Sequence, residues 1–332
     1  MLRRVRTRLG AVAAATAAVL AAAACGDAPA PPGDRLRIVA GFYPLEYVAE
    51  RVGGDRVTVT GLAPTGGHAH DRELTVRQAA LISDADLVIH LSGFQPSVDA
   101  AVRAYARDVL DVARAVPLRT AAAHGRPDHG PAGAGQEPTG HDGAGTDHGA
   151  ETDRGAETDH GVDPHVWLDP HRLAAVTSRV ADALARLDPA HATGYAARAG
   201  ALRADLAELD TAYTDGLARC ERREMVVAHA AFGYVADRYG LHQIAVAGLE
   251  PDGEPTPGRV IEVVELARAH GATTVFAEAR ASPDIARLIA GELGARTATL
   301  DPIEARAPGS DADYLSLMRA NLAALTEGLG CA

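Results

Sequence analysis

Apolar and polar residues follow a pattern that switches repeatedly between the strand period and the helix period. Nearly continuous apolar runs, such as 36–42 and 86–91, are typical of strands buried on both faces. Segment 75–85 between them has apolar residues at three- and four-residue spacing, which predicts an amphipathic helix. This alternation indicates an α/β fold with parallel sheets. The predicted strands are 36–42, 56–62, 86–91, 224–228, 243–247, 273–277 and 296–300, and the predicted helices are 43–51, 75–85, 173–187, 191–220, 232–239, 256–269, 283–293 and 314–329.

One predicted helix, 191–220, is much longer than the others. At ~1.5 Å per residue it would span ~45 Å, enough to run along two packed bodies. The pattern therefore predicts two (β/α) lobes joined by this helix. The N-terminal lobe is expected to comprise residues 36–190 and the C-terminal lobe residues 221–332.

The first 25 residues have the features of an export signal. An Arg-rich start precedes the apolar run 9–24, which is too short and too weakly apolar for a comfortable membrane span. Small residues before Cys25 resemble a bacterial lipoprotein cleavage site, so Cys25 is expected to carry the lipid anchor and residues 26–35 to form a flexible tether. An ordinary secretion signal with an incidental cysteine is the alternative.

Residues 121–161 interrupt the alternating pattern. Apart from alanine they hold almost nothing apolar, so burial cannot offset the entropy of ordering them, and a disordered loop is predicted. Imidazoles and carboxylates recur along the segment, which favours loose metal binding, with a low-complexity insertion as the alternative. The candidate loop ligands are His124, His129, His141, His148 and His160.

The net charge of the chain indicates which partners it suits, and its cysteines indicate a disulfide. A formal net charge of −12 argues against a nucleic-acid partner and suits the handling of cations. If the chain is exported, Cys220 and Cys331 enter an oxidising compartment and are expected to form a disulfide. Two buried thiols are the alternative.

Four polar residues stand in loops at or near the ends of predicted strands or helices. His70 and Asp301 follow strands, His229 follows the strand that opens the second lobe, and His165 precedes a helix. Pro164 directly precedes His165 and Pro170 follows a few residues later, so prolines restrict the backbone on both sides of this histidine. In α/β sheets ligands bind beyond the strand ends, so these side chains are expected to meet between the lobes. Three imidazoles and a carboxylate suit Zn²⁺ in tetrahedral geometry.

Several motifs also resemble, in order, the metal-binding lipoproteins of bacterial ATP-binding-cassette importers for zinc and manganese. The resemblance covers about residues 36–329. The motifs are Gly41-Phe42-Tyr43-Pro44-Leu45, His70-Asp71-Arg72-Glu73, Asp163 to Asp169, His229-Ala230-Ala231-Phe232-Gly233-Tyr234, Glu254-Pro255-Thr256-Pro257, Phe276-Ala277-Glu278 and Asp313-Tyr314-Leu315-Ser316-Leu317-Met318.

The resemblance implies a function and a set of ligands. It implies a monomeric, non-catalytic protein on the outer face of the cell membrane that binds Zn²⁺ between two lobes and delivers it to a permease with its ATPase. The ligands carried over are His70, His165 and His229, with Asp301 as the fourth. Histidine at the third position and the His-rich loop favour zinc over manganese.

The chain departs from the family pattern around two ligands. Alanines flank His229 where relatives have Ser and Asp, and His68 is an additional imidazole that would compete with Asp301 for the fourth position. Glu278 is a candidate for the carboxylate that holds a ligand histidine, or has a structural role.

Other readings stay open alongside zinc capture. A manganese- or iron-specific relative, a surface adhesin and a metal-storage lipoprotein remain alternatives. A secreted zinc hydrolase is disfavoured because the chain has no His-Glu-x-x-His helix and no Gly-x-Ser-x-Gly turn.

Overall fold

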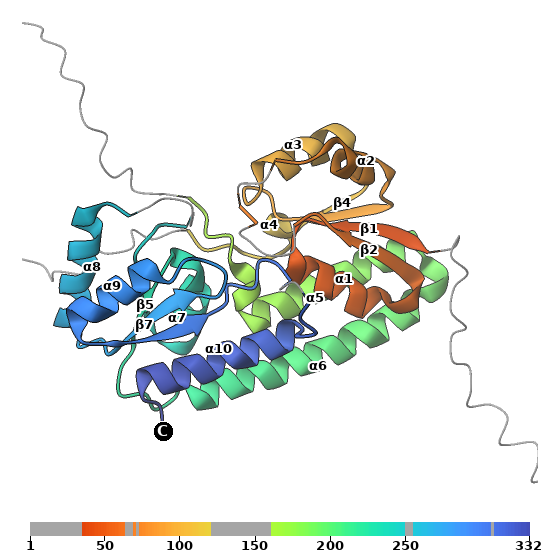
Figure 1. The fold of residues 1–332 in the computed structure, drawn as a ribbon. Helices are drawn as coiled ribbons and strands as arrows, with labels where there is room; N and C mark the ends of the chain where they lie inside the picture. The colour runs from red at the N-terminus through yellow and green to blue at the C-terminus, as the bar shows by residue number, and fades with distance from the viewer. Residues whose placement is uncertain (1–34, 64–68, 71–72, 121–160, 250–254, 307–308) are drawn as a thin grey trace, which may run out of the picture.

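A computed structural model describes residues 35–63, 69–70, 73–120, 161–249, 255–306 and 309–332. They form two lobes, each built on a four-stranded parallel sheet (Figure 1). The α/β class with two lobes, predicted from the alternating pattern, is therefore confirmed.

The N-terminal lobe contains the sheet β2-β1-β3-β4. Its strands pair in parallel, because a helix or loop after each strand carries the chain back to the end of the sheet where that strand began. The elements are β1 (Leu36–Ala40), α1 (Tyr43–Gly53), β2 (Val57–Gly61), α2 (Val76–Asp84), β3 (Leu87–His90), α3 (Pro96–Tyr105), β4 (Val109–Asp111), α4 (Val112–Ala115) and α5 (Pro170–Leu187).

The C-terminal lobe repeats this topology in the sheet β6-β5-β7-β8. In both lobes the chain first adds a strand on one side and then crosses to the other, which creates a switch point beside the first strand. The elements are β5 (Glu224–Val227), α7 (Gly233–Tyr239), β6 (His242–Ala245), α8 (Pro257–Ala269), β7 (Thr274–Glu278), α9 (Asp284–Leu293), β8 (Arg296–Leu300) and α10 (Tyr314–Leu329).

The connecting helix α6 (Ala192–Gly216) follows a short 3-10 turn and ends before the predicted limit of residue 220. It lies beside α10 along the base of both lobes (Figure 1). The buried residues of α6 recur at helical spacing, and the Tyr213 hydroxyl donates to the Met318 carbonyl of α10 at 2.7 Å. One hydrophobic core extends from the first sheet across α5 and α6 to α10, so the lobes share a common base.

Two further findings concern the helices of the described residues. Cys220, just beyond α6, forms a disulfide with Cys331 at the end of α10. Within the described ranges, no helix combines the length and apolar content that crossing a membrane requires.

Candidate metal centre

His70 reaches the space between the lobes from the loop that follows β2. Its ring is buried and packs edge-on against Phe94, with 4.4 Å between the ring centroids. The backbone beside it is held on both sides: the Ala69 amide donates to Glu304 Oε2 at 2.9 Å, and Gln95 Nε2 donates to the Ala69 carbonyl at 2.9 Å. The position of His70 therefore depends on both lobes.

His165 lies in a loop that is fixed before α5 begins. Asp163 Oδ1 accepts hydrogen bonds from the His165 amide at 3.0 Å and interacts with His165 Nδ1 at 2.9 Å. The next residues form a 3-10 turn (Val166–Leu168) in which Trp167 Nε1 donates to the Pro302 carbonyl at 2.7 Å. The sole tryptophan thus holds the His165 loop against the C-terminal lobe.

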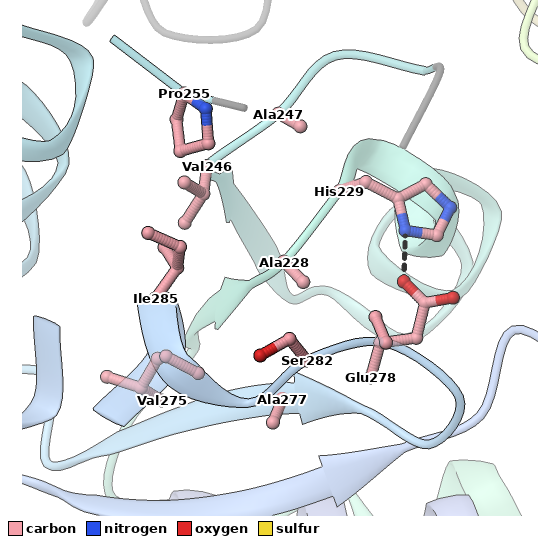
Figure 2. Close-up of a pocket in the computed structure, with 12 residues that line it drawn as sticks. Ala228, His229, Val246, Ala247, Pro255, Val275, Ala277, Glu278, Ser282 and Ile285 are labelled. Atoms are coloured by element: carbon pink, nitrogen blue, oxygen red, sulfur yellow. Dashed lines mark hydrogen bonds and ion pairs between the residues drawn. The ribbon is translucent and has the colours of Figure 1, made fainter. Parts of the chain in front are cut away.

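His229 extends from the second sheet, where it follows β5. Glu278, the last residue of the neighbouring strand β7, contacts His229 Nδ1 through Oε2 at 2.8 Å. Figure 2 shows this contact at the edge of a pocket of about 110 Å³ whose other walls are mostly apolar. The sequence left Glu278 either as the carboxylate that holds a ligand histidine or in a structural role, and the structure places it in contact with His229.

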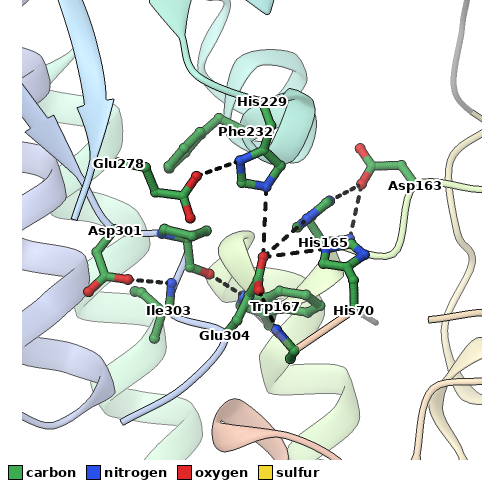
Figure 3. A network of polar contacts seen from close by, with 12 residues as sticks. His70, Asp163, His165, Trp167, His229, Phe232, Glu278, Asp301, Ile303 and Glu304 are labelled. Carbon is green, nitrogen blue, oxygen red and sulfur yellow. Dashed lines mark hydrogen bonds and ion pairs between the residues drawn. The ribbon is translucent and has the colours of Figure 1, made fainter. Parts of the chain in front are cut away.

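The fourth side chain of the cluster is Glu304, which the sequence interpretation missed. It follows β8 in a turn where Ile303 has φ of 58°, a left-handed conformation that is rare for a β-branched residue. The Ile303 amide donates to Asp301 Oδ1 at 2.7 Å, so Asp301 stabilises this turn. The turn directs Glu304 between the lobes (Figure 3).

These side chains form one compact cluster. One ligand atom from each of His70, His165, His229 and Glu304 lies within 4.8 Å of all the others, and all four residues are buried. Glu304 Oε1 lies 3.4 Å from His70 Nε2, 3.8 Å from His165 Nε2 and 3.7 Å from His229 Nε2 (Figure 3). Buried nitrogen atoms that face one carboxylate oxygen at these distances surround a point suited to a cation.

The carboxylates behind two of the rings orient their donor atoms. Asp163 and Glu278 contact Nδ1 of His165 and His229, which leaves Nε2 of each ring facing the centre. A carboxylate that contacts the ring nitrogen facing away from the metal is typical of histidines that bind metals. Three imidazoles and one carboxylate are a donor set that Zn²⁺ accepts in tetrahedral geometry.

The charges of the cluster differ from ring to ring. Burial disfavours the charged form of His165, but hydrogen bonds and charges from Asp163 and Glu304 outweigh it and raise its pKa to about 9. Burial lowers the pKa of His70 despite its contact with Glu304. A metal that binds His165 therefore displaces a proton at neutral pH.

Asp301, the predicted fourth ligand, lies outside this cluster. Its carboxylate forms a two-pronged ion pair with Arg280, at 2.5 Å and 2.9 Å. Its backbone amide donates to Asn321 Oδ1 at 2.8 Å, which further fixes the residue away from the centre. The prediction of Asp301 rested on its position as the first acidic residue after β8. The sequence feature that could have indicated Glu304 is a second acidic residue three positions after Asp301, beyond Pro302.

Several predicted residues lie outside the described ranges. These are Cys25, His68, His124, His129, His141, His148 and His160. A backbone bridge joins Thr120 to Val162, and Val162 directly precedes Asp163.

Comparison with known proteins gives a consistent result. A family model described as zinc-uptake complex component A, periplasmic, matches residues 38–328. The high-affinity zinc uptake system protein ZnuA of Bacillus subtilis is 28% identical over 325 residues, covering 94% of this chain and 95% of the relative. The zinc-binding lipoprotein AdcA of Streptococcus pneumoniae is 30% identical over 296 residues, 88% of this chain. The chain spans 56% of the length of that second relative.

A solved structure shows the same arrangement of elements. The Zn(II)-bound ZnuA-like domain of Streptococcus pneumoniae AdcA superposes with a TM-score of 0.69 at 27% identity. The match covers 89% of this chain and 99% of the domain.

Proposed function

Since the chain belongs to the family of periplasmic zinc-uptake components, we propose that it captures Zn²⁺ outside the cytoplasm and delivers it to the permease of an ATP-binding-cassette importer. The observation that carries the proposal is the buried convergence of three imidazole nitrogens and one carboxylate oxygen within 4.8 Å. The proposed ligands are His70, His165, His229 and Glu304, with Glu304 in place of Asp301.

The donor set supports zinc over manganese as the cargo. Imidazole nitrogen is a softer donor than the oxygen atoms that Mn²⁺ prefers, and only one of the four proposed ligands is a carboxylate. Four protein ligands would also fill a tetrahedral site and leave no position for a reactive water. Capture without catalysis is therefore the proposed role.

The proposed organisation places this site in an exported chain. Residues 1–25 would be the lipoprotein signal, Cys25 the anchor on the outer face of the membrane, and 26–35 a tether. The N-terminal lobe would comprise 36–190, the linking helix 191–220 and the C-terminal lobe 221–332. A monomer is proposed, with the histidines of 121–161 as a separate, weaker set of metal ligands.

Metal titration tests the site directly. Competition with a chromophoric chelator would give the affinities for Zn²⁺ and Mn²⁺ of the mature protein, with and without residues 121–161. We expect one tight zinc site that survives the deletion and exceeds the affinity for Mn²⁺. Loss of all tight binding on deletion would refute the proposed centre.

Matched variants separate the ligands from other histidines. His165→Ala should weaken zinc binding by more than the ~10–100-fold seen when only a partner of a ligand is removed. His242→Ala is the control, because its side chain is 73% exposed and lies on β6 in the C-terminal lobe. Equal affinities of the two variants would contradict the proposal.

A further inference from the structure

A pocket lined by several charged side chains lies in the N-terminal lobe, separate from the four proposed metal ligands. It has a volume of about 700 Å³ and includes His90 and Asp111, which end β3 and β4. Ligands of α/β sheets occupy this edge, beyond the carboxyl ends of parallel strands. The metal centre uses the equivalent edge of the second sheet, through His229 and Glu278.

Arginines from three different helices line this pocket. Arg103 belongs to α3, Arg114 to α4 and Arg179 to α5. Arg114 pairs with Asp111 at 3.3 Å. Arg103 lowers the pKa of Asp99 through its charge, but neither Arg103 nor Arg179 forms an ion pair at contact distance with the part of the chain that the structure describes. Two guanidinium groups therefore remain available at one pocket of a protein whose net charge is −12.

The two carboxylates in the pocket are already occupied by internal donors. Asp111 accepts from the Ser92 amide at 3.1 Å, the Ser92 hydroxyl at 2.9 Å and the Ala113 amide at 3.1 Å. Asp99 is buried and accepts from the Gly93 amide at 2.8 Å. With both aspartates and all three arginines charged, the pocket keeps a formal surplus of one positive charge.

His90 adds an oriented imidazole to the wall. Only 6% of the residue is exposed, and its Nδ1 lies 3.1 Å from Asp99 Oδ1. The buried Asp99 carboxylate beside Nδ1 fixes the orientation of the ring.

We propose that this pocket binds a phosphate group carried by a small organic molecule or a lipid headgroup. Guanidinium groups bind phosphate oxygens through paired hydrogen bonds, which makes arginine the residue suited to this anion. The volume exceeds what a bare phosphate ion needs, which favours a phosphate with an organic substituent. Arg103 and Arg179 would form the principal contacts.

Calorimetric titration of the full mature protein with glycerol 3-phosphate, after removal of metal, tests the proposal. We expect saturable one-to-one binding that Arg103→Gln and Arg179→Gln each weaken at least about tenfold. Arg287→Gln is the matched control, because it removes the same charge from an exposed site on α9. Equal weakening by Arg287→Gln would overturn the proposal.

Vesicle sedimentation identifies the source of the phosphate. Retention on phosphatidylglycerol vesicles but not on phosphatidylcholine vesicles, lost in both pocket variants, would assign the pocket to a lipid headgroup. Binding of glycerol 3-phosphate alone would assign it to a soluble phosphate ester. Unchanged zinc affinity in the two variants would show that they remain folded, and binding in neither assay would refute the phosphate site.

Discussion

At the scale of single residues, two carboxylates of one loop have different partners. Asp301 pairs with Arg280 and accepts a hydrogen bond from the Ile303 amide, whereas Glu304 points among three imidazoles. Ile303, between them, has the left-handed backbone that separates their directions. The first acid therefore supports the loop, and the second is the proposed ligand.

Exchanging each acid for its amide separates these roles. Glu304→Gln should weaken zinc binding by at least about 100-fold, because it replaces a charged ligand with a neutral one. Asp301→Asn should lower the free energy of unfolding by about 1–3 kcal/mol, since it leaves the Arg280 guanidinium without a charged partner. Competition titrations and urea denaturation of both variants measure the two effects. A larger loss of zinc affinity in Asp301→Asn would restore Asp301 as the ligand.

The carboxylates behind the histidines have an effect of their own. Glu278→Gln should weaken zinc binding by about 10–100-fold, because the amide cannot stabilise positive charge on His229 as the carboxylate does. The measurement is the same competition titration. Glu262→Gln on α8 is the control, because that glutamate is 56% exposed and pairs with Arg259. Equal affinities of the Glu278 variant and the parent would show that Glu278 only fills space.

At the scale of elements, a junction of three helices connects the base to both lobes. Asp210 of α6 accepts from Arg238 Nε and Nη2 of α7, each at 2.6 Å, and from the Tyr239 hydroxyl at 2.8 Å. Arg238 also lies 3.4 Å from Asp169, the residue that caps α5. The hydrogen bonds from Arg238 lower the pKa of Asp210 below its usual 3.8.

The lowered pKa predicts how this junction responds to acid. A carboxylate with a depressed folded-state pKa stabilises the protein above its unfolded value and loses that contribution as pH falls through the folded value. Asp210→Asn should therefore cost about 1 kcal/mol at neutral pH, a modest value because solvent screens the pair. The difference from the parent should shrink below pH ~4.

Urea denaturation at several pH values measures this difference, with the exposed Asp215→Asn of the same helix as control. A difference that does not change with pH would mean that Asp210 acts through packing alone.

The elements also show where sequence reasoning reaches its limit. Strands such as β3 and β7, and the amphipathic helices α5 and α10, follow from periodicity because burial imposes it. No element was assigned to α3 or β4, since α3 begins at a proline and β4 has only three residues. The three histidines follow from strand ends and proline context. Glu304 does not, because a left-handed turn that no sequence rule predicts for isoleucine directs it inward.

At the scale of the whole molecule, the disulfide closes the base that the lobes share. Cys220 and Cys331 are 111 residues apart in sequence and join the ends of α6 and α10. Cross-linking so long a segment restricts the unfolded chain strongly.

Replacing both cysteines with serine should lower the free energy of unfolding by about 2–4 kcal/mol and leave zinc affinity unchanged. Denaturation and metal titration of the variant measure both quantities, with the reduced parent as the reference. A large fall in zinc affinity would show that the base also positions the metal centre.

The division of the four proposed ligands between the lobes has a kinetic consequence. His70 and His165 come from the N-terminal side, and His229 and Glu304 from the C-terminal side. On the proposed function, each side alone would be a two-ligand chelator. Tight binding of Zn²⁺ would then come from the effective concentration at which one pair of ligands meets the other. Small separations of the halves would thus speed dissociation greatly. An ion at the proposed site could then leave by stepwise exchange of one ligand at a time, without becoming a free hydrated ion.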